Sequence, residues 1–140
     1  MPRITVVVAD VERDPLSKSA FGDEPDIAIV ARATRSSEAV AAVLRFNPRI
    51  LLCSQRLAAT QEYSLFDDIR EMCPSTLAVL WSERLLDEKD MSVALTKGAV
   101  GVIAGESWDK RLADAIRRID GGEAWVSRKM LGAIRDELIR

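Results

Sequence analysis

Short apolar runs alternate with amphipathic stretches along the chain. The apolar runs are rich in β-branched residues, which is typical of strands that are buried on both faces by flanking helices. The pattern predicts five strands, at residues 3–9, 27–33, 50–53, 77–81 and 101–104. Within the run at 50–53, Leu51 and Leu52 should point to opposite faces of the sheet, and both should be buried.

The stretches between these runs repeat apolar residues three or four positions apart, as amphipathic helices do. They predict helices at residues 14–22, 36–46, 61–72, 88–97 and 108–120, and a last helix at 127–139. Ser36 or Ser37 is the expected N-cap of the second helix, and Val40, Val43 and Leu44 are its expected buried face. A polar loop is predicted between Ser54 and the third of these helices.

Strict alternation of strands and helices predicts a doubly wound five-stranded parallel sheet with helices on both faces, plus an extra C-terminal helix. In such sheets, functional side chains gather where the central strands end. The strand at residues 50–53 should be central, so it carries Ser54 to the carboxyl edge of the sheet.

Composition and charge narrow the possible functions. The chain has 140 residues, which is enough for one domain with its own core, and its net charge is −2. This charge gives no reason to expect direct binding to nucleic acid or to an anionic membrane. Because the sequence contains no histidine, it excludes Ser-His-Asp triads and histidine metal sites within this chain. We expect a cytoplasmic protein, since the first strand begins almost at Met1 and no apolar run is long enough to span a bilayer.

Several segments resemble the receiver domain of two-component response regulators of the NarL/FixJ (LuxR-type) subfamily. They are residues 4–10 (ITVVVAD), 47–52 (NPRILL), 94–102 (ALTKGAVGV) and 115–127 (AIRRIDGGEAWVS). The resemblance implies a flavodoxin-like (CheY-like) fold, with a receiver-like domain at residues 1–122 and a C-terminal linker helix at 123–140. It also implies a helix-turn-helix output domain, which this chain does not contain.

In that family, two acidic residues follow the first strand, an aspartate follows the third, a serine or threonine the fourth and a lysine the fifth. These residues hold Mg²⁺ and transfer a phosphoryl group to the aspartate. The matching positions form a degenerate phosphoacceptor site here, and they are Asp10, Val11, Ser54, Ser82 and Gly105. A single carboxylate binds Mg²⁺ weakly, and a serine without a neighbouring general base is a weak nucleophile. We therefore expect no catalytic residue, no cofactor and at most weak Mg²⁺ binding at Asp10.

Two of these residues keep alternative interpretations. Asp10 is either a remnant of a metal ligand or a solvated carboxylate at the end of a strand. Ser54 is more simply interpreted as a small polar residue that satisfies a loop backbone group than as a nucleophile or a phosphorylation site.

A homodimer is the expected assembly. Mixed charges on the helices at 88–97 and 108–120 can set the choice of partner, and the apolar residues of the last helix need cover. The candidate interface residues are Lys89, Lys97, Arg111, Asp114, Arg118, Leu131, Ile134 and Leu138.

These observations predict an atypical receiver domain that is not an enzyme and that signals by dimerisation or partner binding, without aspartyl phosphorylation. In a longer protein it would regulate transcription through the helix-turn-helix domain. An alternative is a flavodoxin-like domain that binds a small ligand or a nucleotide. That alternative needs a phosphate cradle after the first strand, where Asp10 and Glu12 would repel phosphate. A receiver that binds a small ligand in the altered pocket is a third possibility.

Overall fold

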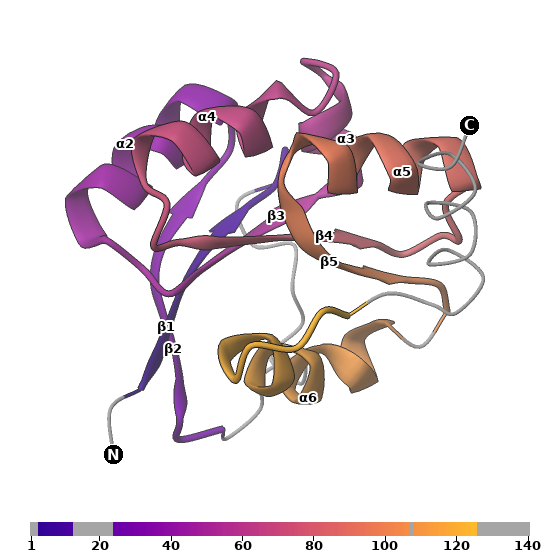
Figure 1. The fold of residues 1–140 in the computed structure, drawn as a ribbon. Helices are drawn as coiled ribbons and strands as arrows, with labels where there is room; N and C mark the ends of the chain where they lie inside the picture. The colour runs from indigo at the N-terminus through magenta and orange to yellow at the C-terminus, as the bar shows by residue number, and fades with distance from the viewer. Residues whose placement is uncertain (1–2, 13–23, 107, 126–140) are drawn as a thin grey trace.

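The computed structural model of the chain describes residues 3–12, 24–106 and 108–125. Five parallel strands form one sheet in the order β2-β1-β3-β4-β5 (Figure 1). The strands are β1 (Ile4–Ala9), β2 (Ile27–Ala33), β3 (Ile50–Ser54), β4 (Leu77–Ser82) and β5 (Ala99–Ala104). The helices are α2 (Ser36–Phe46), α3 (Gln55–Ala59), α4 (Ser64–Met72), α5 (Glu88–Lys97) and α6 (Trp108–Asp120).

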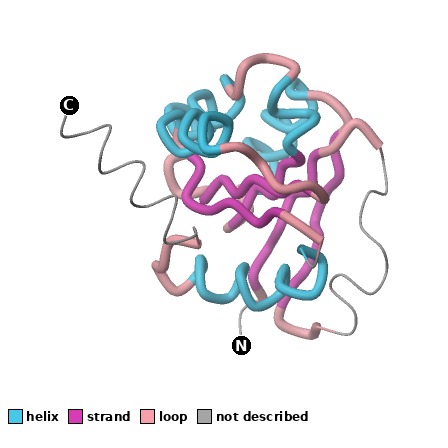
Figure 2. Tube along the Cα trace, turned by 90° about the vertical axis from the view of Figure 1, so that its right-hand side faces the viewer, coloured by secondary structure: helices cyan, strands magenta, loops and turns pink. Residues whose placement is uncertain are grey.

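The sheet separates two hydrophobic cores. One core lies beneath α2, α3, α4 and α5, and the other lies between the sheet and α6 (Figures 1 and 2). On the α6 side, Trp81 of β4 stacks against Trp108 with 5.9 Å between the ring centroids. The predicted doubly wound parallel sheet with helices on both faces is therefore confirmed. The helix expected at 14–22 and the extra C-terminal helix lie outside the described residues.

Strand β3 is the central strand, as predicted, and all five of its residues are buried. Leu51 belongs to the core beneath α2 and α4, whereas Leu52 belongs to the core beneath α6. Because successive side chains of a strand point to opposite faces, a run of apolar residues is stable here only when helices cover both faces.

Three local expectations are wrong. The polar loop predicted after Ser54 contains the helix α3, and the helix predicted at 61–72 is α4, which begins at Ser64. The N-cap of α2 is Arg35 rather than a serine, and the Thr34 hydroxyl donates to Glu38 at 2.8 Å beside it. Leu44 is 52% exposed, because the buried face of α2 is rotated towards Ala39 and Val43.

After α6 the chain returns to the edge of the sheet. Trp125 forms a parallel bridge with Gly101, and the Val102 N–H donates to the Trp125 carbonyl at 2.8 Å. A Cβ atom at Gly101 would lie 2.8 Å from Ile119 Cδ1 and 3.2 Å from Trp125 Cβ, so this close approach favours a glycine. Within the described part of the chain, no helix is long and apolar enough to cross a membrane.

Replacing Leu51 or Leu52 with alanine should lower the free energy of unfolding by about 2–5 kcal/mol in each case, because each change leaves a cavity in a different core. Urea unfolding at neutral pH measures this. Leu44→Ala is the matched control, and its effect should stay below about 1 kcal/mol because Leu44 is half exposed. A nearly neutral Leu51→Ala or Leu52→Ala would mean that one face of the sheet is open to solvent.

Candidate functional site

The structure brings the predicted site positions together at the carboxyl edge of the sheet. Asp10 follows β1, Ser54 and Ser82 end β3 and β4, and Gly105 follows β5. The Ser54 hydroxyl donates to the Asp10 carboxylate at 2.5 Å, and the Gly105 N–H donates to the Ser82 carbonyl at 3.2 Å. Val11, next to Asp10, is 47% exposed and has no oxygen in its side chain. The strand ends therefore form one site from residues far apart in the sequence.

Ser54 is the N-cap of α3. Its hydroxyl oxygen accepts a hydrogen bond from the Leu57 N–H at 3.2 Å, while its proton is donated to Asp10. The expectation that Ser54 satisfies a backbone group is confirmed, although the group belongs to a helix rather than to a loop. With its proton already donated to a carboxylate, the hydroxyl has a fixed structural role in the described site.

Arg56 is a site residue that the sequence did not predict. Its Nε donates to Asp10 Oδ1 at 2.7 Å and its Nη2 donates to Asp10 Oδ2, so the guanidinium forms a bidentate ion pair with the carboxylate. Glu12 adds a looser ion pair with Arg56 at 3.6 Å. Asp10 is fully buried, so the interpretation as a solvated carboxylate is wrong. The only sequence signal was an arginine two residues after Ser54, within a segment expected to be a loop.

These contacts keep Asp10 ionised. Burial alone would raise the pKa of its carboxyl group, but hydrogen bonds from Arg56 and Ser54 and the positive charge of Arg56 outweigh burial and lower the pKa below its usual 3.8. The same partnership raises the pKa of the Arg56 guanidinium further above its already high value, chiefly through the hydrogen bond to Asp10. The pair therefore stays charged at every physiological pH.

The residues present do not fit Mg²⁺. A magnesium site needs several oxygen ligands in octahedral order, and here the one buried carboxylate already carries a guanidinium on both oxygens. A cation beside Asp10 would also face the charge of Arg56 at close range. Among the described residues, no group of three or more aspartate, glutamate, cysteine or histidine side chains could hold a metal ion.

Gly105 carries no charge, and its contribution to the site is its backbone conformation. Its φ is +103°, a backbone conformation that side chains disfavour. A Cβ atom there would lie 3.2 Å from Leu85 Cδ2 and 3.9 Å from Arg111 Nη2. Arg111 itself donates to the Ala104 carbonyl at 2.7 Å, so a guanidinium from α6 lies close to the position where the resemblance predicts a lysine.

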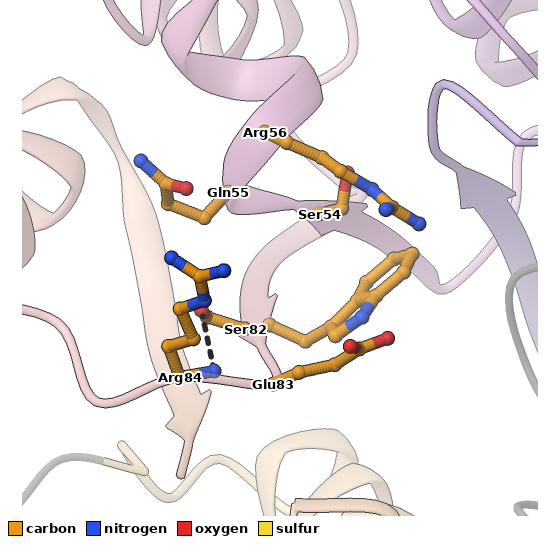
Figure 3. Close-up of a pocket in the computed structure, with 7 residues that line it drawn as sticks. Ser54, Gln55, Arg56, Ser82, Glu83 and Arg84 are labelled. Atoms are coloured by element: carbon orange, nitrogen blue, oxygen red, sulfur yellow. Dashed lines mark hydrogen bonds between the residues drawn. The ribbon is translucent and has the colours of Figure 1, made fainter.

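A pocket of about 330 Å³ opens beside Ser54, between the ends of β3 and β4 (Figure 3). It is lined by two serines, two arginines, a glutamine, a glutamate and a tryptophan. These residues are Ser54, Gln55, Arg56, Trp81, Ser82, Glu83 and Arg84. The Ser82 hydroxyl accepts a hydrogen bond from the Arg84 N–H at 3.2 Å, which orders the first turn of the loop after β4.

Similarity to known proteins lies in the structure rather than in the sequence. No protein-family model matches the sequence, and no curated protein matches it. The isolated receiver domain of RcsB from Salmonella enterica serovar Typhimurium is similar in structure, with a TM-score of 0.80, 12% identity, and coverage of 95% of this chain and 99% of that one. A LuxR-family two-component response regulator from Aurantimonas sp. SI85-9A1 has a TM-score of 0.78 at 19% identity, with 99% of each chain covered.

The chain has the receiver-domain fold. The receiver domain of the putative response regulator NarL from Mycobacterium tuberculosis agrees, with a TM-score of 0.69, 18% identity, and coverage of 84% of this chain and 98% of that one. The resemblance stated from the sequence is thereby confirmed for the fold. The functional roles of Asp10, Val11, Ser54, Ser82 and Gly105 stay predictions.

Several of the charged residues expected at an interface have partners within the chain. Lys97 pairs with Asp67 at 3.3 Å, and Arg118 pairs with Asp114 at 3.2 Å and lies over the Trp125 ring. An interface role for these residues, for Lys89 and for Arg111 stays a prediction. Leu131, Ile134 and Leu138 lie outside the described residues.

Replacing Arg56 with glutamine should lower the free energy of unfolding by about 2 kcal/mol at pH 7, because it leaves the buried Asp10 charge without its main partner. The folded-state pKa of Asp10 lies below its unfolded value, so the pair stabilises the protein above the unfolded pKa, and this stability is lost as the pH falls through the folded pKa. The difference between the wild type and Arg56→Gln should therefore shrink between pH 7 and pH 3, as measured by urea unfolding.

Arg35→Gln is the matched control, because Arg35 pairs with Glu38 at 3.5 Å on the surface and its side chain is 74% exposed. This change should alter the free energy of unfolding by less than about 1 kcal/mol at either pH. Equal effects of the two substitutions at pH 7 would contradict a structural role for the Arg56–Asp10 pair.

Proposed function

We propose that this chain is a regulatory domain with the receiver fold that signals through partner binding, without aspartyl phosphorylation and without enzymatic activity. The observation that carries the proposal is the three-residue lock formed by Asp10, Ser54 and Arg56. In this lock, a guanidinium lies against the acidic residue that the resemblance assigns to Mg²⁺, and a helix-capping serine stands at the acceptor position.

The lock favours a single permanent state of the site. An arginine side chain is not deprotonated in proteins, so its charge beside Asp10 cannot be switched by pH or by a kinase. A phosphoryl group would bring negative charge to an edge where Asp10, Glu12 and Glu83 already gather. Regulation is therefore expected to act through what the domain binds.

The proposal also includes a DNA-binding output domain. One of the similar structures is described as two RcsB dimers bound to two parallel DNAs, and this chain covers 68% of the length of that protein chain. We infer that residues 1–122 form the receiver-like part and 123–140 a linker helix. That helix would lead to a DNA-binding domain in a longer cytoplasmic protein that regulates transcription as a homodimer.

The unmodified protein should give no phosphoryl adduct by intact mass after incubation with acetyl phosphate and Mg²⁺, because the acceptor carboxylate and the metal cradle are both lacking. The contacts of Arg56 with Asp10 also predict how substitutions change Mg²⁺ binding. Val11→Asp with Ser54→Asp should still bind Mg²⁺ poorly, since Arg56 keeps its charge there. Adding Arg56→Gln should tighten Mg²⁺ binding about tenfold or more, as measured by calorimetry.

Two outcomes would overturn this proposal. One is an adduct on the unmodified protein near Ser54. The other is equal Mg²⁺ affinity in the double and triple variants, which would show that Arg56 does not oppose the metal. Arg35→Gln added to the double variant is the control for removing an arginine distant from the site, and it should leave Mg²⁺ affinity unchanged.

The proposed homodimer should appear in sedimentation velocity as a concentration-dependent increase of the sedimentation coefficient in the micromolar range. If the charged faces of α5 and α6 contribute, the association should weaken as the salt concentration rises, because exposed charges are screened. Lys89→Glu should change the dissociation constant, whereas Arg45→Glu on α2 should not. A strictly monomeric protein at all concentrations would contradict the dimer.

A further inference from the structure

We propose that the pocket beside Ser54 binds a small organic carboxylate, with Arg84 and Ser82 as its recognition residues. The inference rests on the proposed function, because it assigns a regulatory ligand to a site that the lock has removed from phosphoryl chemistry. The pocket measures about 330 Å³, a size suited to a small organic acid.

The pocket has two chemically different sides. In Figure 3 the Arg84 guanidinium points towards Gln55 on one side of the pocket, while Arg56 and Glu83 lie on the other side. Arg56 is neutralised by Asp10 and Glu12, and the charge of Glu83 also acts on it. Arg84 forms no ion pair with any other residue of the described ranges. The excess positive charge therefore lies on the Arg84 side.

Hydrogen-bond donors converge on this side. The Ser82 hydroxyl uses its oxygen to accept from the Arg84 N–H, so its proton is available to a ligand. The Gln55 amide lines the same side and donates to the Tyr63 hydroxyl at 3.3 Å, which fixes its orientation. Together with the planar fork of the Arg84 guanidinium, the Ser82 proton matches the two oxygens of a carboxylate.

The remaining surface favours an organic ligand. Trp81 forms an apolar wall of the pocket and is held in place by its stacking on Trp108. Leu85, the neighbour of Arg84, is 85% exposed on the same loop. Inorganic phosphate would gain nothing from the Trp81 wall, whereas the ring of an aromatic acid would lie against it.

Benzoate is a suitable probe, because it joins a carboxylate to a flat apolar ring. In ¹H–¹⁵N NMR spectra of the 140-residue chain without Mg²⁺, benzoate should give saturable shifts of the Gln55, Ser82 and Arg84 amides and of the Trp81 indole. The expected dissociation constant is on the order of millimolar. Benzamide, which has the same shape without the charge, and inorganic phosphate should each bind about tenfold more weakly or worse.

Matched variants separate a specific site from a general charge effect. Arg84→Gln should weaken benzoate binding about tenfold or more, because a charge-assisted pair is lost. Glu83→Gln removes the opposite charge from the same loop, and it should leave benzoate binding unchanged or tighter. Arg45→Gln on α2 is the control for the loss of a distant positive charge.

Any one of three results would overturn the carboxylate site: no saturable shift with benzoate, benzamide or phosphate binding as tightly as benzoate, or an unchanged affinity in Arg84→Gln. This test contains no Mg²⁺ or acetyl phosphate, so its failure is distinguishable from that of the proposed function. A phosphoryl adduct with saturable benzoate binding would reject the absence of phosphorylation alone. Absent benzoate binding with no adduct would reject the ligand alone.

Discussion

The charge pair between Asp10 and Arg56 is the interaction on which the carboxyl edge of the sheet depends. A buried carboxylate is strongly unfavourable unless hydrogen-bond donors and an opposite charge surround it. Here the guanidinium satisfies both oxygens and the Ser54 hydroxyl adds a third donor. Because Ser54 also caps α3, the same contacts fix the start of that helix, and the helix in turn presents Gln55 to the pocket.

The fold makes this arrangement possible by placing distant residues at one edge. Parallel strands end on the same side of the sheet, so β1 supplies Asp10, β3 supplies Ser54 and β4 supplies Ser82 to one small region. The helices on both faces bury the strands that carry these residues. The polar site therefore lies on tightly packed apolar cores, which hold its hydrogen-bonding and charged side chains at fixed distances from one another.

The sequence was sufficient for the fold because its strongest signals are periodic. The continuous apolar run around Leu51 and Leu52 required helices on both faces of β3, and the structure has them. The end of the third strand also placed Ser54 at the carboxyl edge, and the resemblance placed Ser82 and Gly105 at the same edge. The fold predictions depend on patterns that extend over many residues, which makes them robust to single exceptions.

The predictions that were wrong or missing concern contacts that no local sequence pattern reports. Arg56 reaches back to a residue 46 positions earlier, and no local pattern reports such a contact. Helix α3 has five residues, too few for a helical period to stand out from a loop. At α2, two adjacent serines looked like capping residues, but the N-cap is Arg35, and the Thr34 hydroxyl beside it donates to Glu38. The chemistry of the site was thus less predictable than its location.

The return of Trp125 to β5 restricts how another molecule can use this end of the sheet. An exposed strand edge is a template on which a foreign strand can pair through backbone hydrogen bonds. Here the Val102 N–H already pairs with the Trp125 carbonyl, and Arg118 lies over the indole ring. At this point on β5, the chain acts as its own neighbouring strand. A partner that approaches there must recognise side chains rather than extend the sheet, which makes recognition depend on sequence and protects the edge from indiscriminate association.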